Sequence, residues 1–312
     1  MENQLICICG PTASGKTALS TALAKERGTE VISADSMQLY RGMDIGTAKP
    51  TEAEKQGIPH HLLDIRDPGE PFSVAQYVSL ADACAQELLA EGKIPIVAGG
   101  TGLYMDALIE CSDFPGNETD HTLRERFQRM AQEQGNEAVH EALRAVDPEG
   151  AERLHPNNLK RVIRALEVYY QTGMTLGELN ARNKRPEPKY QAYKIGICPA
   201  SREALYRRID RRVEGMLREG LLDECMQLLE AGKLTGTAAQ AIGYKELIPC
   251  IEGRESLESC MEKLKQHTRN YAKRQLTWLA RDPGIHWLRY EEDTQLALLL
   301  QDSTAFLRSC GV

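Results

Sequence analysis

Near its N-terminus the chain reads Gly10-Pro11-Thr12-Ala13-Ser14-Gly15-Lys16-Thr17. This is the pattern of a phosphate-binding P-loop, a glycine-rich turn between a strand and a helix. Glycines at its two ends let the backbone turn its N–H groups inward toward an anion. Lys16 supplies a positive charge for the outer phosphate, and Thr17 supplies a hydroxyl that can coordinate Mg²⁺. An ordinary glycine turn is the alternative, but it leaves the Lys-Thr pair unexplained.

The residues on either side of the loop have the character that it requires. Residues 5–9 form a short apolar run typical of a buried strand, and residues 18–25 are rich in alanine and leucine, which favour a helix. That helix would direct the positive end of its dipole at the same anion. The order strand, loop, helix therefore predicts an α/β fold, with a P-loop NTPase-like parallel sheet flanked by helices.

Length and composition narrow the class of protein. A chain of 312 residues suggests about two domains, and 42% hydrophobic residues can form a substantial core. Because the sequence has no apolar run of about 18 residues and starts directly on a strand pattern, we expect a cytoplasmic protein without a membrane span or signal peptide. The nine cysteines include no Cys-x-x-Cys pair, so they indicate reduced thiols and no zinc site. The net charge of −7 argues mildly against nucleic-acid binding, so any such surface must be local.

Two further strand patterns end in residues suited to chemistry. Residues 30–33 run into Asp35, and residues 94–98 run into Gly99-Gly100-Thr101. Because ligands bind at the carboxyl ends of parallel strands, Asp35 and Thr101 should lie beside the phosphates. Asp35 could act as a general base or hold magnesium through water, while helix capping is the alternative role for both residues. A third strand is predicted at residues 61–65.

The middle of the chain has a different character. Residues 118–190 show helical periods and no convincing strand, and strand patterns return at residues 193–198 and, as an edge strand, at 285–288. We therefore predict a core domain of residues 1–115 and 191–312 and a helical insertion domain at 116–190. Within the insertion, Lys160, Arg161 and Arg164 occupy neighbouring helical positions, although a basic helix face is often only solvated surface.

Two helices of the core domain are also basic. In the helix over residues 202–218, Arg208 and Arg212 lie one turn apart and can point at one target, as a bidentate phosphate clamp would require. In a second helix, residues 267–281 hold four arginine or lysine residues and no acidic residue, with Tyr271 and Trp278 between them. This mixture suits a polynucleotide backbone with bases that can stack.

Together these segments resemble the tRNA dimethylallyltransferases, also called tRNA isopentenyltransferases. The resemblance covers nearly the whole chain and rests on six segments in the expected order. They are the P-loop, Ala34-Asp35-Ser36-Met37-Gln38, Gly99-Gly100-Thr101-Gly102-Leu103-Tyr104, Arg161-Val162-Ile163-Arg164-Ala165-Leu166-Glu167, Ile242-Gly243-Tyr244-Lys245-Glu246 and Thr268-Arg269-Asn270-Tyr271-Ala272-Lys273-Arg274-Gln275-Leu276-Thr277-Trp278. The layout resembles that of bacterial members, because the C-terminal zinc finger that eukaryotic members often add has no counterpart in the cysteine and histidine spacing.

The resemblance implies a prenyl-transfer reaction. A dimethylallyl group would pass from dimethylallyl diphosphate to the exocyclic 6-amino group of the adenosine just 3′ of the anticodon, in tRNAs reading codons that start with U, with release of pyrophosphate. In this family the P-loop holds the isoprenoid diphosphate rather than a nucleotide. The implied cofactor is Mg²⁺, the implied partners are dimethylallyl diphosphate and the anticodon stem-loop of tRNA, and we expect a monomer that binds no membrane.

The resemblance also implies roles for individual residues. The diphosphate would be held by Gly10, Pro11, Thr12, Ala13, Ser14, Gly15, Lys16, Thr17, Arg208 and Arg212, with Thr17 as the magnesium ligand. The catalytic residues would be Asp35 as general base, Thr101 and Lys16. The tRNA would be bound by Asp35, Ser36, Met37, Gln38, Thr101, Arg124, Lys160, Arg161, Val162, Ile163, Arg164, Gln240, Gly243, Tyr244, Lys245, Lys273, Arg274, Gln275, Thr277 and Trp278.

Three other functions remain to be weighed. A P-loop kinase or other ATP-using enzyme shares the loop and the sheet but does not explain the basic, aromatic C-terminal helix. An adenylate isopentenyltransferase would use a free nucleotide as acceptor and needs neither a helical insertion nor an RNA grip. A non-catalytic RNA-binding module leaves the phosphate site without a purpose.

Overall fold

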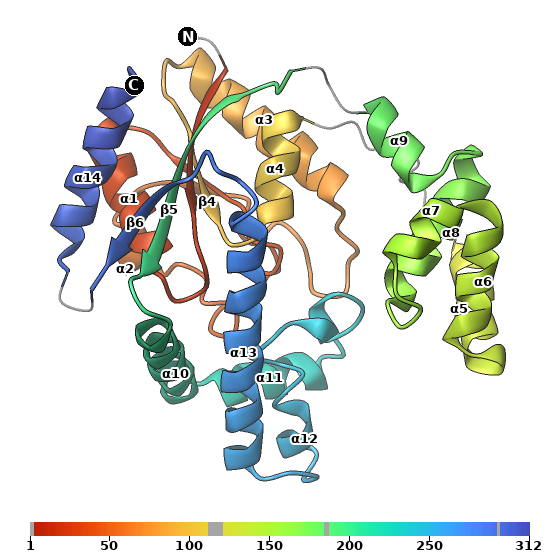
Figure 1. The fold of residues 1–312 in the computed structure, drawn as a ribbon. Helices are drawn as coiled ribbons and strands as arrows, with labels where there is room; N and C mark the ends of the chain where they lie inside the picture. The colour runs from red at the N-terminus through yellow and green to blue at the C-terminus, as the bar shows by residue number, and fades with distance from the viewer. Residues whose placement is uncertain (1–2, 112–120, 184–186, 292–293) are drawn as a thin grey trace. The chain divides into compact units, whose positions relative to one another are not determined.

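The computed structural model describes residues 3–111, 121–183, 187–291 and 294–312. The chain forms two compact units, which we call the core unit (Met1–Cys111 with Pro188–Val312) and the helical unit (Ser112–Glu187). Each unit has its own cluster of buried apolar side chains. Figure 1 shows the elements of both units along the chain.

The core unit is built on a parallel sheet. Within the described residues, six strands pair in the order β3-β2-β4-β1-β5-β6, and each neighbouring pair is parallel. The strands are β1 (Gln4–Cys9), β2 (Val31–Ser33), β3 (His60–His61), β4 (Ile96–Gly99), β5 (Gln191–Pro199) and β6 (His286–Tyr290). The predicted α/β fold is confirmed, and β6 occupies a sheet edge as expected.

Helices cover both faces of this sheet, as a sheet buried on both sides requires. The helices of the core unit are α1 (Lys16–Arg27), α2 (Glu52–Lys55), α3 (Val74–Ala90), α4 (Gly102–Glu110), α10 (Arg202–Arg218), α11 (Leu221–Glu230), α12 (Ile248–Ile251), α13 (Leu257–Leu279) and α14 (Leu296–Ser309), with a 3₁₀ turn, η1 (Ala238–Gln240). In Figure 1, α10 to α13 extend beyond the carboxyl ends of the strands.

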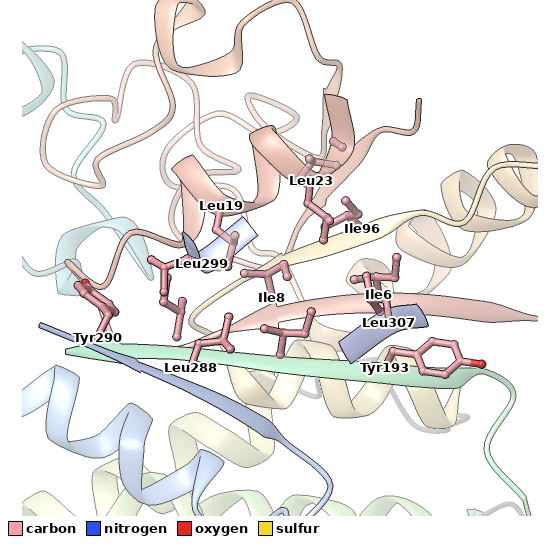
Figure 2. Close-up of a cluster of buried hydrophobic side chains, with 14 residues drawn as sticks. Ile6, Ile8, Leu19, Leu23, Ile96, Tyr193, Leu288, Tyr290, Leu299 and Leu307 are labelled. Carbon is pink, nitrogen blue, oxygen red and sulfur yellow. The ribbon is translucent and has the colours of Figure 1, made fainter. Parts of the chain in front are cut away.

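Strand β1 shows how the two faces are filled. Because successive side chains of a strand point to opposite faces, Ile6 and Ile8 share one face. There they join Leu19 and Leu23 of α1 and Leu299 of α14 in a buried apolar cluster (Figure 2). This burial fixes the direction of α1, and with it the position of the P-loop at the helix start.

The opposite face of β1 carries Cys7 and packs against α3 and α4. The rings of Tyr77 in α3 and Tyr104 in α4 stack there with their centroids 4.1 Å apart. Burial raises the pKa of the Cys7 thiol to about 12. The thiol is therefore a packing group that stays neutral.

The third strand is shorter than the sequence predicts. We expected a strand at residues 61–65, but β3 covers only His60–His61. The chain turns away at once because Leu62 and Asp64 adopt left-handed backbone conformations, with φ of +64° and +56°. The buried ammonium of Lys49 holds the turn by donating to the Asp64 carboxylate at 2.5 Å.

One side chain of the core unit contacts both points at which the chain leaves for the helical unit and returns from it. Asp82 Oδ1 accepts hydrogen bonds from Cys111 Sγ (3.8 Å), Lys189 Nζ (2.5 Å) and the Tyr190 hydroxyl (2.6 Å). The returning backbone also joins the end of α4 directly, because Tyr190 N donates to the Ile109 carbonyl at 3.1 Å.

The helical unit contains helices and no strand among its described residues. Its helices are α5 (His121–Gln134), α6 (Asn136–Val146), α7 (Pro148–Arg153), α8 (Leu159–Thr172) and α9 (Leu176–Asn183). Phe127 of α5, Leu143 of α6 and Leu166 of α8 are buried together in its core. Nowhere in the described ranges is there a helix with both the length and the apolarity to cross a membrane.

Candidate active site

The P-loop connects β1 to α1 in a conformation that requires glycine at both ends. Gly10 has φ of +152°, and a Cβ there would lie 2.2 Å from the Ile197 carbonyl oxygen. Gly15, the N-cap of α1, has φ of +91°. Because glycine has no side chain to cap a helix, the first amide groups of α1 remain available to an anion. The loop geometry is therefore that of a phosphate cradle.

Three cations surround this cradle. Lys16 Nζ donates to the Pro11 carbonyl at 2.7 Å, from within the loop itself. From α10, Arg208 Nε donates to the Ala13 carbonyl at 2.9 Å, and Arg212 Nη1 donates to Thr12 Oγ1 at 3.2 Å. The two arginines predicted to form a clamp are thus held against consecutive residues of the loop.

The positive charges in the cradle perturb one another. Burial, and then the nearby Arg212 charge, lower the pKa of Lys16 to about 8, against a smaller opposing effect of Asp35. Burial also lowers the pKa of Arg212. Cations held close together in a buried place favour an anionic ligand, because the ligand relieves both the repulsion and the desolvation.

A second wall of the site follows β2 and β4. Asp35 Oδ1 accepts hydrogen bonds from Met37 N (2.9 Å) and Gln38 N (3.4 Å), so the carboxylate closes a tight turn and caps no helix. Thr101 stands at the start of α4, but its hydroxyl makes no cap bond and instead accepts from Ser36 N at 3.3 Å. These contacts join Asp35 and Thr101 into one structure, as parallel strands predict for residues at their carboxyl ends.

The two walls enclose a cavity of about 1090 Å³. Sites for single small ligands are typically about 300–1,000 Å³, so this cavity has room for more than one small group. The predicted site residues that line it are Thr12, Ala13, Ser14, Gly15, Lys16, Thr17, Asp35, Ser36, Met37, Gln38, Arg208, Arg212, Gln240, Gly243, Lys245, Arg274 and Gln275. Residues from both parts of the sequence that form the core unit, Met1–Cys111 and Pro188–Val312, thus line one cavity.

Comparison with known proteins identifies the family. The family model described as IPP transferase matches residues 38–282, and the model described as isopentenyl transferase matches residues 3–71. The chain belongs to the tRNA dimethylallyltransferase family. The tRNA dimethylallyltransferase of Geobacillus thermodenitrificans is 47% identical over 97% of this chain and 95% of its own length. The enzyme of the same name from Alkaliphilus oremlandii is 49% identical over 92% of this chain and 91% of its own length.

Solved structures agree with this assignment to the dimethylallyltransferases. A tRNA isopentenylpyrophosphate transferase from Staphylococcus epidermidis is 42% identical, with a TM-score of 0.72 and 99% of both chains covered. A eukaryotic dimethylallyltransferase acting on tRNA is 31% identical, with a TM-score of 0.82, covering 99% of this chain and 78% of the other. The predicted family and enzyme class are confirmed.

Other predicted residues of the core unit lie outside the cavity lining, and among them are Gly10, Pro11 and Thr101. Lys273 and Thr277 are exposed on α13. Trp278 is half-buried, and its Nε1 donates to Asp106 Oδ2 at 2.8 Å. Tyr244 is fully buried, with its hydroxyl donating to Glu224 at 2.6 Å. Its ring has no exposed surface that a base could stack on.

The residues of the helical unit that were predicted to bind tRNA differ in how far they are exposed. Lys160 and Arg161 are exposed at the start of α8. Arg124 and Arg164 are partly exposed and both contact the Glu167 carboxylate, with Arg124 Nε at 2.7 Å and Arg164 Nη1 at 3.6 Å. The side chains of the two remaining residues, Val162 and Ile163, belong to the unit's apolar core, so direct side-chain contact with RNA is not available to them.

Two residues that the sequence analysis did not assign also shape the site. Glu224 of α11 accepts from the backbone amides of Asp44, Ile45 and Gly46 at 2.8–3.0 Å and so anchors a loop that lines the cavity. Tyr271 of α13 lines the cavity, and burial, then the Asp35 charge, raise the pKa of its hydroxyl. No local pattern distinguishes Glu224 from any other acid on an amphipathic helix.

The donor set around the P-loop suits a hard cation that takes most of its ligands from substrate and water. Among the described residues there is no group of three or more His, Cys, Asp or Glu side chains that could hold a metal. Thr17 and Asp35 both line the cavity and offer oxygen ligands next to the phosphate cradle. This matches magnesium, which keeps several waters and uses few protein oxygens when it binds with phosphates.

Proposed function

We propose that this enzyme transfers the dimethylallyl group from dimethylallyl diphosphate to the 6-amino group of the adenosine immediately 3′ of the anticodon, in tRNAs reading codons that start with U. Pyrophosphate is the second product. The observation that carries the proposal is the pairing of a cationic phosphate cradle with a carboxylate wall across one cavity. The names of its relatives, which describe dimethylallyltransferases that act on tRNA, agree with it.

The P-loop binds the diphosphate. Its inward amides, the helix dipole and the charges of Lys16, Arg208 and Arg212 meet the negative charge that grows on the leaving group as the bond breaks. Mg²⁺, held by the Thr17 hydroxyl, would add a Lewis acid that neutralises diphosphate charge. Hydrogen bonds from α10, α13 and β6 hold the loop in place, as electrostatic catalysis by preorganised groups requires.

Asp35 acts as the general base. The nitrogen of the adenine amine forms a bond to the first carbon of the dimethylallyl group, while the bond from that carbon to the diphosphate oxygen breaks and its electron pair stays on the oxygen. The proton leaves the amine for the Asp35 carboxylate. The two backbone amides on Oδ1 fix the orientation of this carboxylate. Thr101, tied to Ser36, offers a hydroxyl near the breaking bond.

The RNA reaches this cavity with one base turned out of its stack. An adenine inside a stacked anticodon loop cannot enter such a cavity, so the nucleotide must flip. Ser36, Met37 and Gln38 line the cavity and would surround the base. Exposed basic residues of α13, among them Lys273 and Arg274, would bind the phosphates beside it. In the insertion domain, residues 116–190, exposed Lys160 and Arg161 would extend this grip.

The test is prenyl transfer with labelled dimethylallyl diphosphate. We expect label in bulk tRNA, in the adenosine beside the anticodon after nuclease digestion, no transfer to free AMP and no ATP hydrolysis. Lys16→Ala should abolish transfer, while Lys25→Ala, an exposed lysine of the same helix, should behave as the parent. Transfer to AMP alone would identify a free-nucleotide enzyme, and ATP hydrolysis would favour a kinase. Sedimentation of the purified protein tests whether it is a monomer, as expected. Fractionation of cells that express it tests the expected cytoplasmic location.

A further inference from the structure

Gln275 is buried on a helix whose neighbouring residues are exposed. Its residue surface is only 6% accessible, whereas Lys273 and Arg274 beside it on α13 are exposed. Its amide spans two segments that are distant in the sequence. Oε1 accepts from Thr12 N in the P-loop at 2.8 Å, and Nε2 donates to the Gly100 carbonyl after β4 at 3.0 Å.

The chemistry of the two partners specifies an amide at this position. Thr12 N can only donate and the Gly100 carbonyl can only accept, so one side chain must offer both an acceptor and a donor. The fit is also tight, because a Cβ added to Gly100 would lie 2.1 Å from Gln275 Nε2. Glutamine thus fills a bridge that an acid, an ammonium or an apolar chain cannot complete.

The bridge joins the two halves of the reaction site. On one side, Thr12 belongs to the phosphate cradle, where its hydroxyl accepts from Arg212. On the other side, Gly100 precedes Thr101, whose hydroxyl accepts from the amide of Ser36. One helical turn before Gln275, Tyr271 also lines the cavity.

We propose that Gln275 is a positioning residue for prenyl transfer, which fixes the distance between the phosphate cradle and the wall that carries Thr101 and Asp35. This inference rests on the proposed function and differs from the sequence-based prediction that Gln275 contacts tRNA. The reacting carbon must lie between the leaving diphosphate and the attacking amine. A side chain that sets the spacing of the two walls therefore sets the approach of the reacting atoms.

The expected effect is large for a side chain that acts through the spacing of the two walls. Displacing reacting groups by about 1 Å can slow a reaction roughly 10²-fold. Gln275→Met keeps the length of the side chain but leaves Thr12 N and the Gly100 carbonyl without partners. Gln275→Glu keeps the acceptor for Thr12 N, loses the donor to Gly100 and adds a negative charge beside the cradle.

The experiment measures three quantities for each variant: the single-turnover rate with saturating tRNA and dimethylallyl diphosphate, the inhibition constant of pyrophosphate, and the Kd for tRNA without diphosphate. For Gln275→Met we expect a rate about 10²-fold lower, pyrophosphate binding several-fold weaker and a Kd for tRNA within about twofold of the parent. Gln275→Glu should weaken pyrophosphate binding further. Gln266→Met, an exposed glutamine on the same helix, is the matched control.

The contrasting result is equally specific. If Gln275 contacts RNA, Gln275→Met will raise the Kd for tRNA while the saturated single-turnover rate stays at the parent value, and the proposal is overturned. If Gln275→Met does not fold, as judged by its melting temperature, Gly100→Ala carries the same test by pushing the amide away. A parent protein that never labels tRNA refutes the proposed function itself, whereas a parent-like Gln275→Met in an active enzyme refutes only this inference.

Discussion

Replacing Asp35 with asparagine separates the chemistry of the site from its shape. In the parent, Oδ1 holds the turn by accepting from Met37 N and Gln38 N, and the described residues provide no hydrogen-bond partner for Oδ2. Asparagine keeps an oxygen in the Oδ1 position, so both backbone bonds can persist. We therefore expect the free energy of unfolding to change by no more than about 0.5 kcal/mol.

The reaction rate should respond much more strongly. An amide cannot take up the proton of the adenine amine, and general-base assistance typically contributes about 10²–10⁴-fold. At about 1.36 kcal/mol for each factor of ten, the barrier rises by about 2.7–5.4 kcal/mol. This change is many times larger than the expected change in stability. If Asp35→Asn loses that much of its transfer rate but is as stable as the parent, Asp35 has a role in the chemistry.

The assay is single-turnover transfer of labelled dimethylallyl to tRNA, with Asp67→Asn as the control because Asp67 is exposed on a loop. We expect the Kd for tRNA to remain within about tenfold of the parent. If Asp35 serves mainly to hold magnesium, the variant will bind the diphosphate poorly and excess metal will partly restore activity, which would refute the base assignment. Full activity in Asp35→Asn would refute both roles.

Three further outcomes are expected. Because Lys16 has a pKa of about 8 in the free protein, the affinity for dimethylallyl diphosphate should fall about tenfold for each pH unit above 8, and calorimetry of Lys16→Met should show weaker binding without this slope. Changing Arg161 and Arg274, both exposed, to alanine should reduce the slope of log affinity for tRNA against log salt by about one unit for each lost phosphate contact, and an unchanged slope would place the RNA elsewhere. Glu167→Gln leaves Arg124 without its buried carboxylate and should lower the free energy of unfolding, measured by urea titration, by about 1–3 kcal/mol. The loss should be smaller than for a fully buried ion pair because Arg124 is partly exposed. No loss would mean that the ion pair is dispensable.

The sequence predicts those features that depend on neighbours along the chain. The P-loop could be predicted because its strand, glycines and helix are contiguous. The length of β3 could not, because the turn that ends it places non-glycine residues in left-handed conformations and is held by Lys49, whose interactions are set by tertiary structure. Periodicity alone gives no reason for the strand to end there.

Helix α13 illustrates a second limit of prediction. Its composition correctly indicates a helix with an exposed basic surface, but composition cannot tell which polar residues face inward. Gln275 and Trp278 find partners at Thr12, Gly100 and Asp106, which lie more than 170 residues away in the sequence. A polar side chain on a polar helix is buried only because of those partners, and only the tertiary structure names them.

The cluster around Asp82 bears on how an enzyme of this kind could be assembled. One carboxylate meets the chain both where it leaves α4, at Cys111, and where it returns, at Lys189 and Tyr190. Strand β5 therefore follows α4 in space as if the residues between them were a side branch. A parallel sheet connected in this way can gain, lengthen or lose such a branch without any change in its strand order. Evolution, or a protein engineer, can therefore exchange the helical module without altering the strands that carry the P-loop.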